Sequence, residues 1–193
     1  MPIVALTCHP ATPCVSIRRF AVQARRSRAG LLTLRYVIEG DLAGVRLPDP
    51  RPPRRADELW RRTCFEAFLA GRECAGYYEF NFAPSAEWAV YRFTAYRTGM
   101  TVVEPAAPPT ITLLAGADRL ELEAVVELAE LAAEPGDAEQ RLALSAVIEE
   151  QSGQCSYWAA RHPPGPPDFH HPDSFALPFD PSYSNHGIDL TAG

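Results

Sequence analysis

Two glutamates are the residues of this sequence best suited to acid–base chemistry. Glu66 and Glu79 lie in the segments CFEAFLAG and YYEFNF, whose alternating side chains predict two adjacent strands of one hairpin. Both carboxyl groups are expected on the same face of that hairpin. Carboxyl groups that face each other raise the pKa of one of them, as acid–base catalysis requires. A glycan-acting enzyme is therefore one hypothesis, and pairing of each glutamate with an arginine such as Arg92 or Arg97 is the alternative.

Three tryptophans provide a second functional hypothesis, the binding of a ring-shaped ligand. Trp60, Trp88 and Trp158 lie in separate segments, and the first two have carboxylate, amide and guanidinium groups close in sequence. Sugar rings pack their C–H faces on indole, and their hydroxyls exchange hydrogen bonds with such polar groups. The alternative is that the tryptophans fill the core. The expected ligand-binding set is Trp60, Glu66, Glu79, Asn81, Trp88, Arg92 and Trp158, with no catalytic residue among them.

Ligand-type side chains are also dense between residues 162 and 173, at His162, Asp168, His170, His171 and Asp173. Their spacing is irregular and prolines interrupt it, so a structural loop is favoured over a metal site. The five cysteines are odd in number and form no CxxC pair, which excludes a zinc ribbon. Cys155 could pair with His162 as a nucleophile, but a buried free thiol is favoured.

Composition excludes several other functions. The chain has no lysine, so a P-loop lysine and a Schiff-base lysine are absent. Its net charge is −6 and its arginines form no long tract, so no nucleic-acid partner is expected. Glutamates interrupt the most apolar region, so no membrane partner is expected either. The first residues do not resemble a signal peptide, which favours a cytoplasmic location.

Short apolar runs separated by Pro and Gly predict an all-β protein. Strands are expected at 14–24, 30–39, 63–71, 77–85, 87–97, 110–114, 120–128, 141–149 and 155–160, with a short helix as the alternative for 87–97. Two proline-rich segments, 48–55 and 162–193, are expected to lie outside the sheets. With no βαβ alternation, residues 1–193 are predicted to form a single domain, an antiparallel β-sandwich of jelly-roll or immunoglobulin-like type.

Two blocks of this sequence carry a resemblance to a known family. They are LWRRTCFEAFLAG…YYEFNFAPSAEWAVYRF…YRTGM and SYWAARHPPGPPDFHHPDSF. Together they resemble the bacterial DOMON-like domain proteins, a group related to the family-nine carbohydrate-binding modules. The resemblance implies a β-sandwich that binds a small-molecule or carbohydrate ligand without catalysis. The aromatic clamp of the sugar-binding relatives would match Trp60, Trp88 and Trp158. Glu66 and Asn81 would match their polar residues. Ala86 stands where relatives tend to have glycine.

The same resemblance leaves open a second, haem-binding role. Haem-binding relatives hold iron between a methionine and a histidine. Met100 and His162 fall inside the two blocks and would be the ligands here. No cofactor is expected under the carbohydrate hypothesis, so uptake of haem would distinguish the haem-binding hypothesis from the carbohydrate-binding one.

Overall fold

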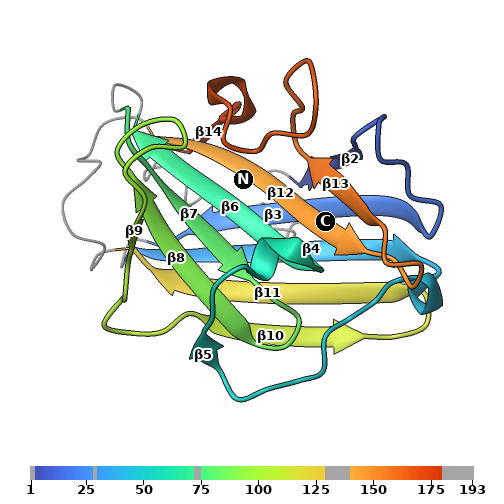
Figure 1. Ribbon diagram of the computed structural model, residues 1–193. Coiled ribbons are helices and arrows are strands. Elements are labelled where there is room, and N and C mark those ends of the chain that lie inside the picture. The colour runs from blue at the N-terminus through green and yellow to red at the C-terminus, as the bar shows by residue number, and fades with distance from the viewer. Residues whose placement is uncertain (1–2, 28–29, 72–74, 129–139, 180–193) are drawn as a thin grey trace, which may run out of the picture.

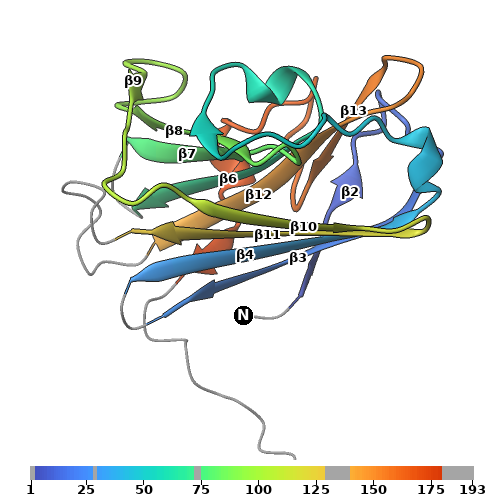
Figure 2. The ribbon, with the colours of Figure 1, turned by 90° about the horizontal axis from the view of Figure 1, so that it is seen from below.

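Two β-sheets packed face to face form the architecture of this protein (Figures 1 and 2). The computed structural model describes residues 3–27, 30–71, 75–128 and 140–179. Within them, the smaller sheet has the order β1 (Val4–Ala5), β3 (Ile17–Arg26), β4 (Leu31–Gly40), β11 (Arg119–Glu127) and β10 (Thr110–Ala115). The larger sheet has the order β2 (Thr7–Cys8), β13 (Cys155–Ala159), β12 (Gln140–Glu149), β6 (Cys64–Gly71), β7 (Tyr77–Phe82), β8 (Glu87–Phe93) and β5 (Arg54–Arg55). In addition, β14 (Leu177–Phe179) pairs with β12, and β9 (Thr101–Val102) pairs with β8.

The predicted all-β fold and antiparallel sandwich are confirmed. Every expected strand is present with its boundaries shifted by a few residues, and the further strands are two or three residues long. The helical alternative for 87–97 is wrong. Residues 87–93 form β8, because each residue from Trp88 to Phe93 has a cross-strand partner in β7. One described strand pair, β5 with β8, is parallel.

Strict alternation along the central strands separates a core face from an outer face. In β11, Leu120, Leu122, Ala124 and Val126 are buried toward the larger sheet, and the glutamates between them are less buried. In β6 and β7 both faces are buried, because loops cover the outer one. Any polar residue on the outer face of such a strand is therefore largely shielded from water.

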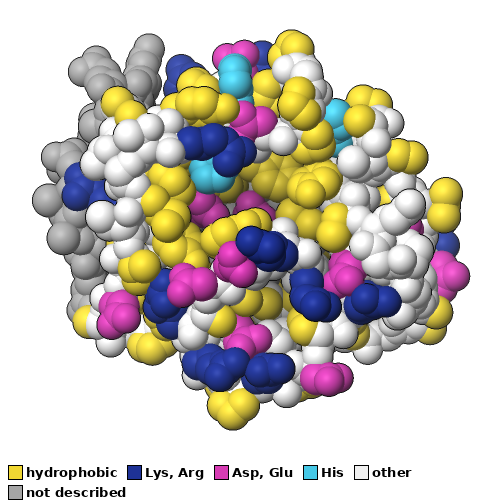
Figure 3. Space-filling model, in the orientation of Figure 1, with side chains coloured by type: hydrophobic (Ala, Val, Ile, Leu, Met, Phe, Trp, Pro, Cys, Tyr) yellow, Lys and Arg dark blue, Asp and Glu magenta, His cyan; other side chains and the backbone are white. Residues whose placement is uncertain are grey.

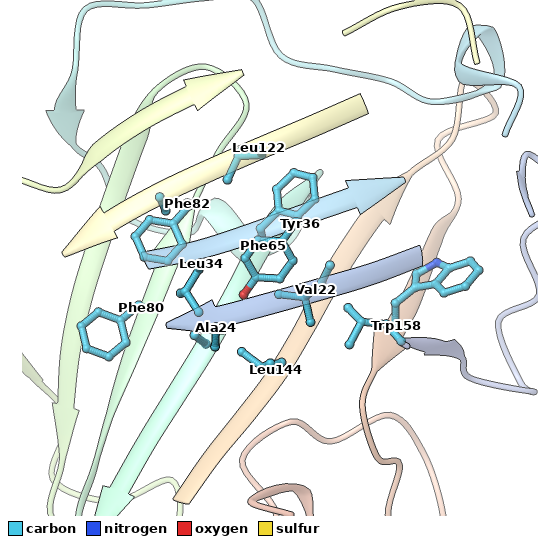
Figure 4. Close-up of a cluster of buried hydrophobic side chains, with 14 of the residues drawn as sticks. Val22, Ala24, Leu34, Tyr36, Phe65, Phe80, Phe82, Leu122, Leu144 and Trp158 are labelled. Carbon is cyan, nitrogen blue, oxygen red and sulfur yellow. The ribbon is translucent and has the colours of Figure 1, made fainter. Parts of the chain in front are cut away.

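Aromatic rings hold the two sheets together (Figure 4). The ring of Phe65 lies 5.2 Å from that of Tyr36 and 6.0 Å from that of Phe20, which also contacts Trp158 at 5.6 Å. The hydroxyl of Tyr36 donates a 2.7 Å hydrogen bond to the backbone carbonyl of Glu66. This bond ties a core residue of the smaller sheet to β6 of the larger one.

Most of the described residues of the proline-rich segments run outside the sheets as expected, but each segment contributes one short strand, β5 and β14, and Phe179 of β14 is buried in the core. Residues 48–53 form no regular element, and Arg54–Arg55 make the short edge strand β5. From 162 to 176 the chain packs on the outer face of the larger sheet, where Phe169 and Phe175 join Phe68 and Tyr77 in a second apolar cluster. The last part of the predicted C-terminal segment, 180–193, lies outside the described residues. Three 3₁₀ turns complete the fold: η1 (Leu42–Gly44), η2 (Leu59–Arg61) and η3 (Pro172–Ser174).

The turn between β7 and β8 contains a residue in the left-handed conformation. Ala86 has a φ of 72°, and its amide donates to the carbonyl of Ala83. Glycine adopts this conformation at the lowest free-energy cost, so alanine is strained here. Among the described residues, no helix is long and apolar enough to cross a membrane.

Candidate functional site

A cavity of about 360 Å³ opens on the outer face of the larger sheet. Its floor comes from the strands, and its walls come from the turn η2, the β8–β9 connection and the loop after β13. The lining residues are Trp60, Glu66, Glu79, Tyr91, Phe93, Arg97, Met100, Val147, Tyr157, Pro167, Phe169 and His170. Figure 3 shows this face hollowed near its middle, where carboxyl groups lie beside a histidine and a hydrophobic patch.

Strand alternation brings the two predicted glutamates to this floor. Glu66 lies opposite Asn81 in the β6–β7 register, and Glu79 lies opposite Phe68. The two glutamates are therefore diagonal neighbours on one face rather than directly opposed. Diagonal side chains of this length lie within reach of each other. The prediction that both carboxyl groups share the face away from Phe65 and Phe80 is confirmed.

Glu66 is a buried carboxyl group with an unfilled hydrogen-bonding position. The residue is 3% exposed, and its Oε1 has no hydrogen-bond partner among the described residues. Burial raises its pKa well above the usual value, repulsion from Glu79 adds to the rise, and the charge of Arg97 opposes it. These effects favour the protonated form of Glu66, which can offer a ligand both an O–H donor and an acceptor.

Glu79 has a different environment, which keeps it ionised at neutral pH. Burial raises its pKa to about 6, while the hydrogen bond from Asn81 and the charge of Arg97 limit the rise. The amide Nδ2 of Asn81 donates to Glu79 Oε1 at 2.7 Å, and His170 Nε2 lies 3.7 Å from Oε2. The two neighbouring carboxyl groups of the floor therefore differ in pKa, with the larger rise at Glu66.

His170 is held in one orientation above the floor. Its Nδ1 lies 2.8 Å from the hydroxyl of Tyr77, which also accepts a hydrogen bond from the amide of Arg97. In the tautomer in which Nδ1 accepts the Tyr77 proton, the ring hydrogen lies on Nε2, which faces Glu79. Burial and the charge of Arg97 lower the pKa of His170 to about 4, so the ring is neutral near pH 7.

An ion pair connects two walls of the cavity. Arg97 Nη2 donates to Asp168 Oδ1 at 2.8 Å, and the hydroxyl of Tyr96 donates to Asp168 Oδ2 at 2.6 Å. The amide of His170 also donates to Asp168. These bonds fasten the loop after β13 to the turn between β8 and β9, and they hold His170 in place over the floor.

The structure separates the remaining sequence-predicted residues from the cavity. Asn81 is fully buried behind Glu79 and supports it rather than facing a ligand. Trp88 and Trp158 lie in the core between the sheets, because their strand positions face the smaller sheet. Figure 4 shows Trp158 within this cluster. Arg92 is exposed on the face of β8 opposite to Tyr91. Of the three tryptophans, Trp60 alone lines the cavity.

The two residues expected to hold haem do not share this cavity. Met100 lines it and is 53% exposed. His162 lies outside its lining, with Nε2 at 2.9 Å from the carbonyl of Thr7 and its ring against His9. The residues therefore do not fit axial ligation of one iron, for which both side chains must reach the same metal.

The other candidate sites have structural explanations. Asp168 and His171 accept backbone amides of their own loop, and among the described residues no group of three or more His, Cys, Asp or Glu is placed to hold a metal ion. Cys155 lies near the carbonyl of Arg61, with Sγ and O 3.9 Å apart, and His162 bonds Thr7 instead. The Cys155–His162 pair is therefore not formed.

Several cavity residues lie outside the ligand-binding set expected from the sequence. Tyr91 and Tyr157 could have been found, because the alternation that places Trp88 and Trp158 on one face places them on the other. Phe169 and His170 come from an irregular loop whose path no periodicity predicts. Arg97 follows the end of β8 with a φ of 51°, in a turn that the sequence pattern does not specify.

Comparisons with known proteins agree with the sandwich fold. No family model matches the chain, and no curated protein matches its sequence. Among solved structures, a candidate carbohydrate-binding protein of Bacteroides uniformis is similar with a TM-score of 0.69 at 16% identity, over 93% of this chain and 87% of that one. A family-nine carbohydrate-binding module of Caldicellulosiruptor kristjanssonii matches with a TM-score of 0.47, at 10% identity in its glucose complex and 9% in its cellotriose complex. These matches cover 84% and 86% of this chain, and 76% and 82% of the module.

The buried carboxyl groups predict a specific dependence of stability on pH. Both groups bind a proton more tightly in the folded than in the unfolded chain, so their ionisation opposes folding as the pH rises above about 4.5; for Glu79 this loss of stability runs through a pH of about 6. Substituting Glu66→Gln removes one such group and keeps its shape. We expect the melting temperature of the variant to exceed that of the wild type at pH 8, with the difference shrinking toward pH 4.5.

Differential scanning calorimetry across this pH range measures the effect. Glu123→Gln, which alters a solvent-exposed carboxylate of β11, is the matched control and should show no comparable trend. His170 acts in the opposite direction, because its lowered pKa costs stability as pH falls from about 6.5 toward 4, but it contributes equally in both proteins. A constant difference between Glu66→Gln and wild type at every pH would contradict the prediction.

Proposed function

We propose that this protein is a non-catalytic module that binds a carbohydrate or a similar polar ring compound in the cavity above Glu66 and Glu79. The observation that carries the proposal is an unpartnered, buried carboxyl oxygen of Glu66 on the floor of a cavity lined by aromatic rings. Such an atom costs free energy unless a ligand supplies its hydrogen bond. Aromatic walls with a few fixed polar groups are typical of small-molecule sites.

The chemistry of the cavity suits a sugar ring. Trp60, Tyr91 and Tyr157 offer apolar faces for C–H groups, and Glu66, Glu79 and Arg97 offer donors and acceptors for hydroxyls. The cavity volume of about 360 Å³ lies at the lower end of the range for small-molecule pockets. The DOMON-like resemblance of the sequence and the sugar complexes named above are in keeping with this class of ligand, although the proposal depends on the cavity alone.

Intrinsic fluorescence tests the proposal with one residue as a reporter. Since Trp88 and Trp158 are buried in the core, a ligand in the cavity should perturb the emission of Trp60 only. We expect a sugar that binds by calorimetry to change the fluorescence of the wild type. The Trp60→Phe variant should keep an aromatic wall and measurable binding while losing the fluorescence change.

The matched control is Trp158→Phe, which should retain the ligand-induced change because Trp60 is intact. Calorimetric binding that leaves Trp60 emission unaltered would place the ligand elsewhere. If mono- and oligosaccharides of common neutral and charged types all fail to bind, the carbohydrate proposal is excluded.

A second candidate function is catalysis on a glycan by the two glutamates. The specific observation in its favour is that the two environments differ: burial and repulsion from Glu79 raise the pKa of Glu66 well above its usual value, whereas the pKa of Glu79 rises only to about 6. A neutral acid beside a carboxylate is the arrangement used by glycosidases. Turnover of a substrate panel by the wild type, lost in Glu66→Gln, would support it; turnover unchanged in that variant would exclude this role.

A further inference from the structure

The charges that face the cavity do not balance. Glu66 and Glu79 are the acidic lining residues, and Arg97 is the one cation among the lining residues. The guanidinium of Arg97 is bound to Asp168 at the rim, 2.8 Å away, and its side chain is 51% exposed. The floor is therefore left with two carboxyl groups and no cation bonded to either among the described residues.

Unfilled hydrogen-bonding positions lie on the floor and next to it. Glu66 Oε1 is buried and has no hydrogen-bond partner among the described residues. Ser145 of β12, directly opposite Glu66 in the sheet register, does not line the cavity, but its Oγ is likewise buried and unpartnered among these residues. In the same part of the chain, the group that lies near Glu79 Oε2 is His170, at 3.7 Å. The two lining carboxyl groups thus offer acceptors to one incoming group with several donors.

The surrounding rings favour a positive charge over a neutral hydroxyl. Trp60 and Tyr91 meet edge to face at 5.9 Å, and Phe93, Tyr157 and Phe169 complete the aromatic surface around the carboxyl groups. The faces of such rings attract cations, and the low dielectric of a buried floor strengthens attraction to a carboxylate. A protonated amine has three N–H donors, which matches the acceptors on the floor.

We propose that the ligand of this site is an amino sugar, bound with its ammonium group against Glu66 and Glu79 and its ring against the aromatic walls. This inference rests on the proposed function and adds the chemical class of the sugar. Neutral and anionic sugars are expected to bind more weakly, because they leave the negative charge of the floor uncompensated.

Binding of the amine should release a proton. Before binding, burial and repulsion from Glu79 raise the pKa of Glu66 well above its usual value. An ammonium group between the two favours the ionised form, so the Glu66 proton leaves to solvent as the ion pair forms. The other groups near the two glutamates keep their protonation states. His170 is neutral, and Arg97 is paired with Asp168. The hydroxyls of the nearby tyrosines have raised pKa values, at Tyr77, Tyr91 and Tyr157.

Calorimetric titration with matched sugar pairs tests the inference on the full chain. The probes are D-glucosamine, D-galactosamine and D-mannosamine, each compared with its parent hexose and its N-acetyl derivative at about pH 6.5, where amines are protonated. We expect at least one amine to bind about tenfold or more tightly than both neutral partners, a gain of about 1.4 kcal/mol. Repeating the titration in buffers of different ionisation enthalpy should reveal proton release for the amine only.

Two variants locate the effect on the floor. Glu66→Gln and Glu79→Gln should each reduce the ratio of amine to hexose affinity toward unity, and Glu66→Gln should also abolish proton release. Glu123→Gln on the exposed face of β11 is the matched control and should keep both.

The outcomes separate this inference from the proposed function. Equal affinity for amines and parent hexoses would overturn the amino-sugar inference and leave sugar binding intact. An amine preference that persists in both floor variants would also overturn it. Failure of every sugar in all three sets to bind would count against the proposed function as well.

Discussion

The Phe65→Ala variant is expected to lose about 3–5 kcal/mol of unfolding free energy, the usual cost of removing a buried phenylalanine. Phe65 is fully buried and its ring contacts Phe20 and Tyr36 from the opposite sheet. Its removal leaves a cavity between the sheets, at the point where Tyr36 bonds the carbonyl of Glu66. Urea unfolding followed by far-UV circular dichroism measures the loss.

The control for this prediction is Leu114→Ala, which removes an exposed apolar side chain of β10. Its unfolding free energy should change by no more than about 0.5 kcal/mol. A Phe65→Ala variant as stable as this control would mean that the two sheets do not pack through Phe65 and its aromatic neighbours.

The Trp60→Ala variant is expected to bind its ligand about 30-fold more weakly, corresponding to about 2 kcal/mol for an aromatic residue at the centre of a site. Trp60 is partly exposed on η2 and packs against Tyr91 at the cavity. Its loss removes a wall of the cavity without opening the core, so the melting temperature should change little. Calorimetric titration with the ligand found for the wild type measures the affinity.

Trp88→Phe provides the opposite control. Trp88 is 5% exposed and packs between the sheets, so this variant should lose stability while its affinity stays within about twofold. Retention of full affinity in Trp60→Ala, or loss of it in a folded Trp88→Phe variant, would contradict the assignment of the cavity as the site.

The contrast between these two tryptophans shows what the sequence could and could not predict. Alternation in β7 and β8 is regular, so the faces of Phe80 and Glu79 were predictable, and with them the fold class. The same pattern placed Trp88 with Phe80 on one side, but it does not reveal which side another sheet covers. Both faces of β7 are buried, so burial alone could not distinguish core from site.

The glutamates were predictable for a different reason. A carboxyl group in a strand buried on both sides requires a local explanation, and Glu66 and Glu79 stand among aromatic residues on adjacent strands. The residue that lies near Glu79 is His170. It comes 91 positions later in the sequence and belongs to an irregular loop. Contacts of this kind depend on the path of a loop, for which sequence periodicity has no signal.

The cavity is assembled from parts of unequal rigidity. Its floor belongs to strands β6, β7, β8 and β12, whereas one wall is a loop fastened by the Arg97–Asp168 ion pair. Exchange of residues 163–171 could therefore widen or narrow the opening while the carboxyl pair beneath stays in register. Sequence changes in this loop would therefore alter the size of the ligand that fits the cavity before they alter the ligand charge that the cavity prefers.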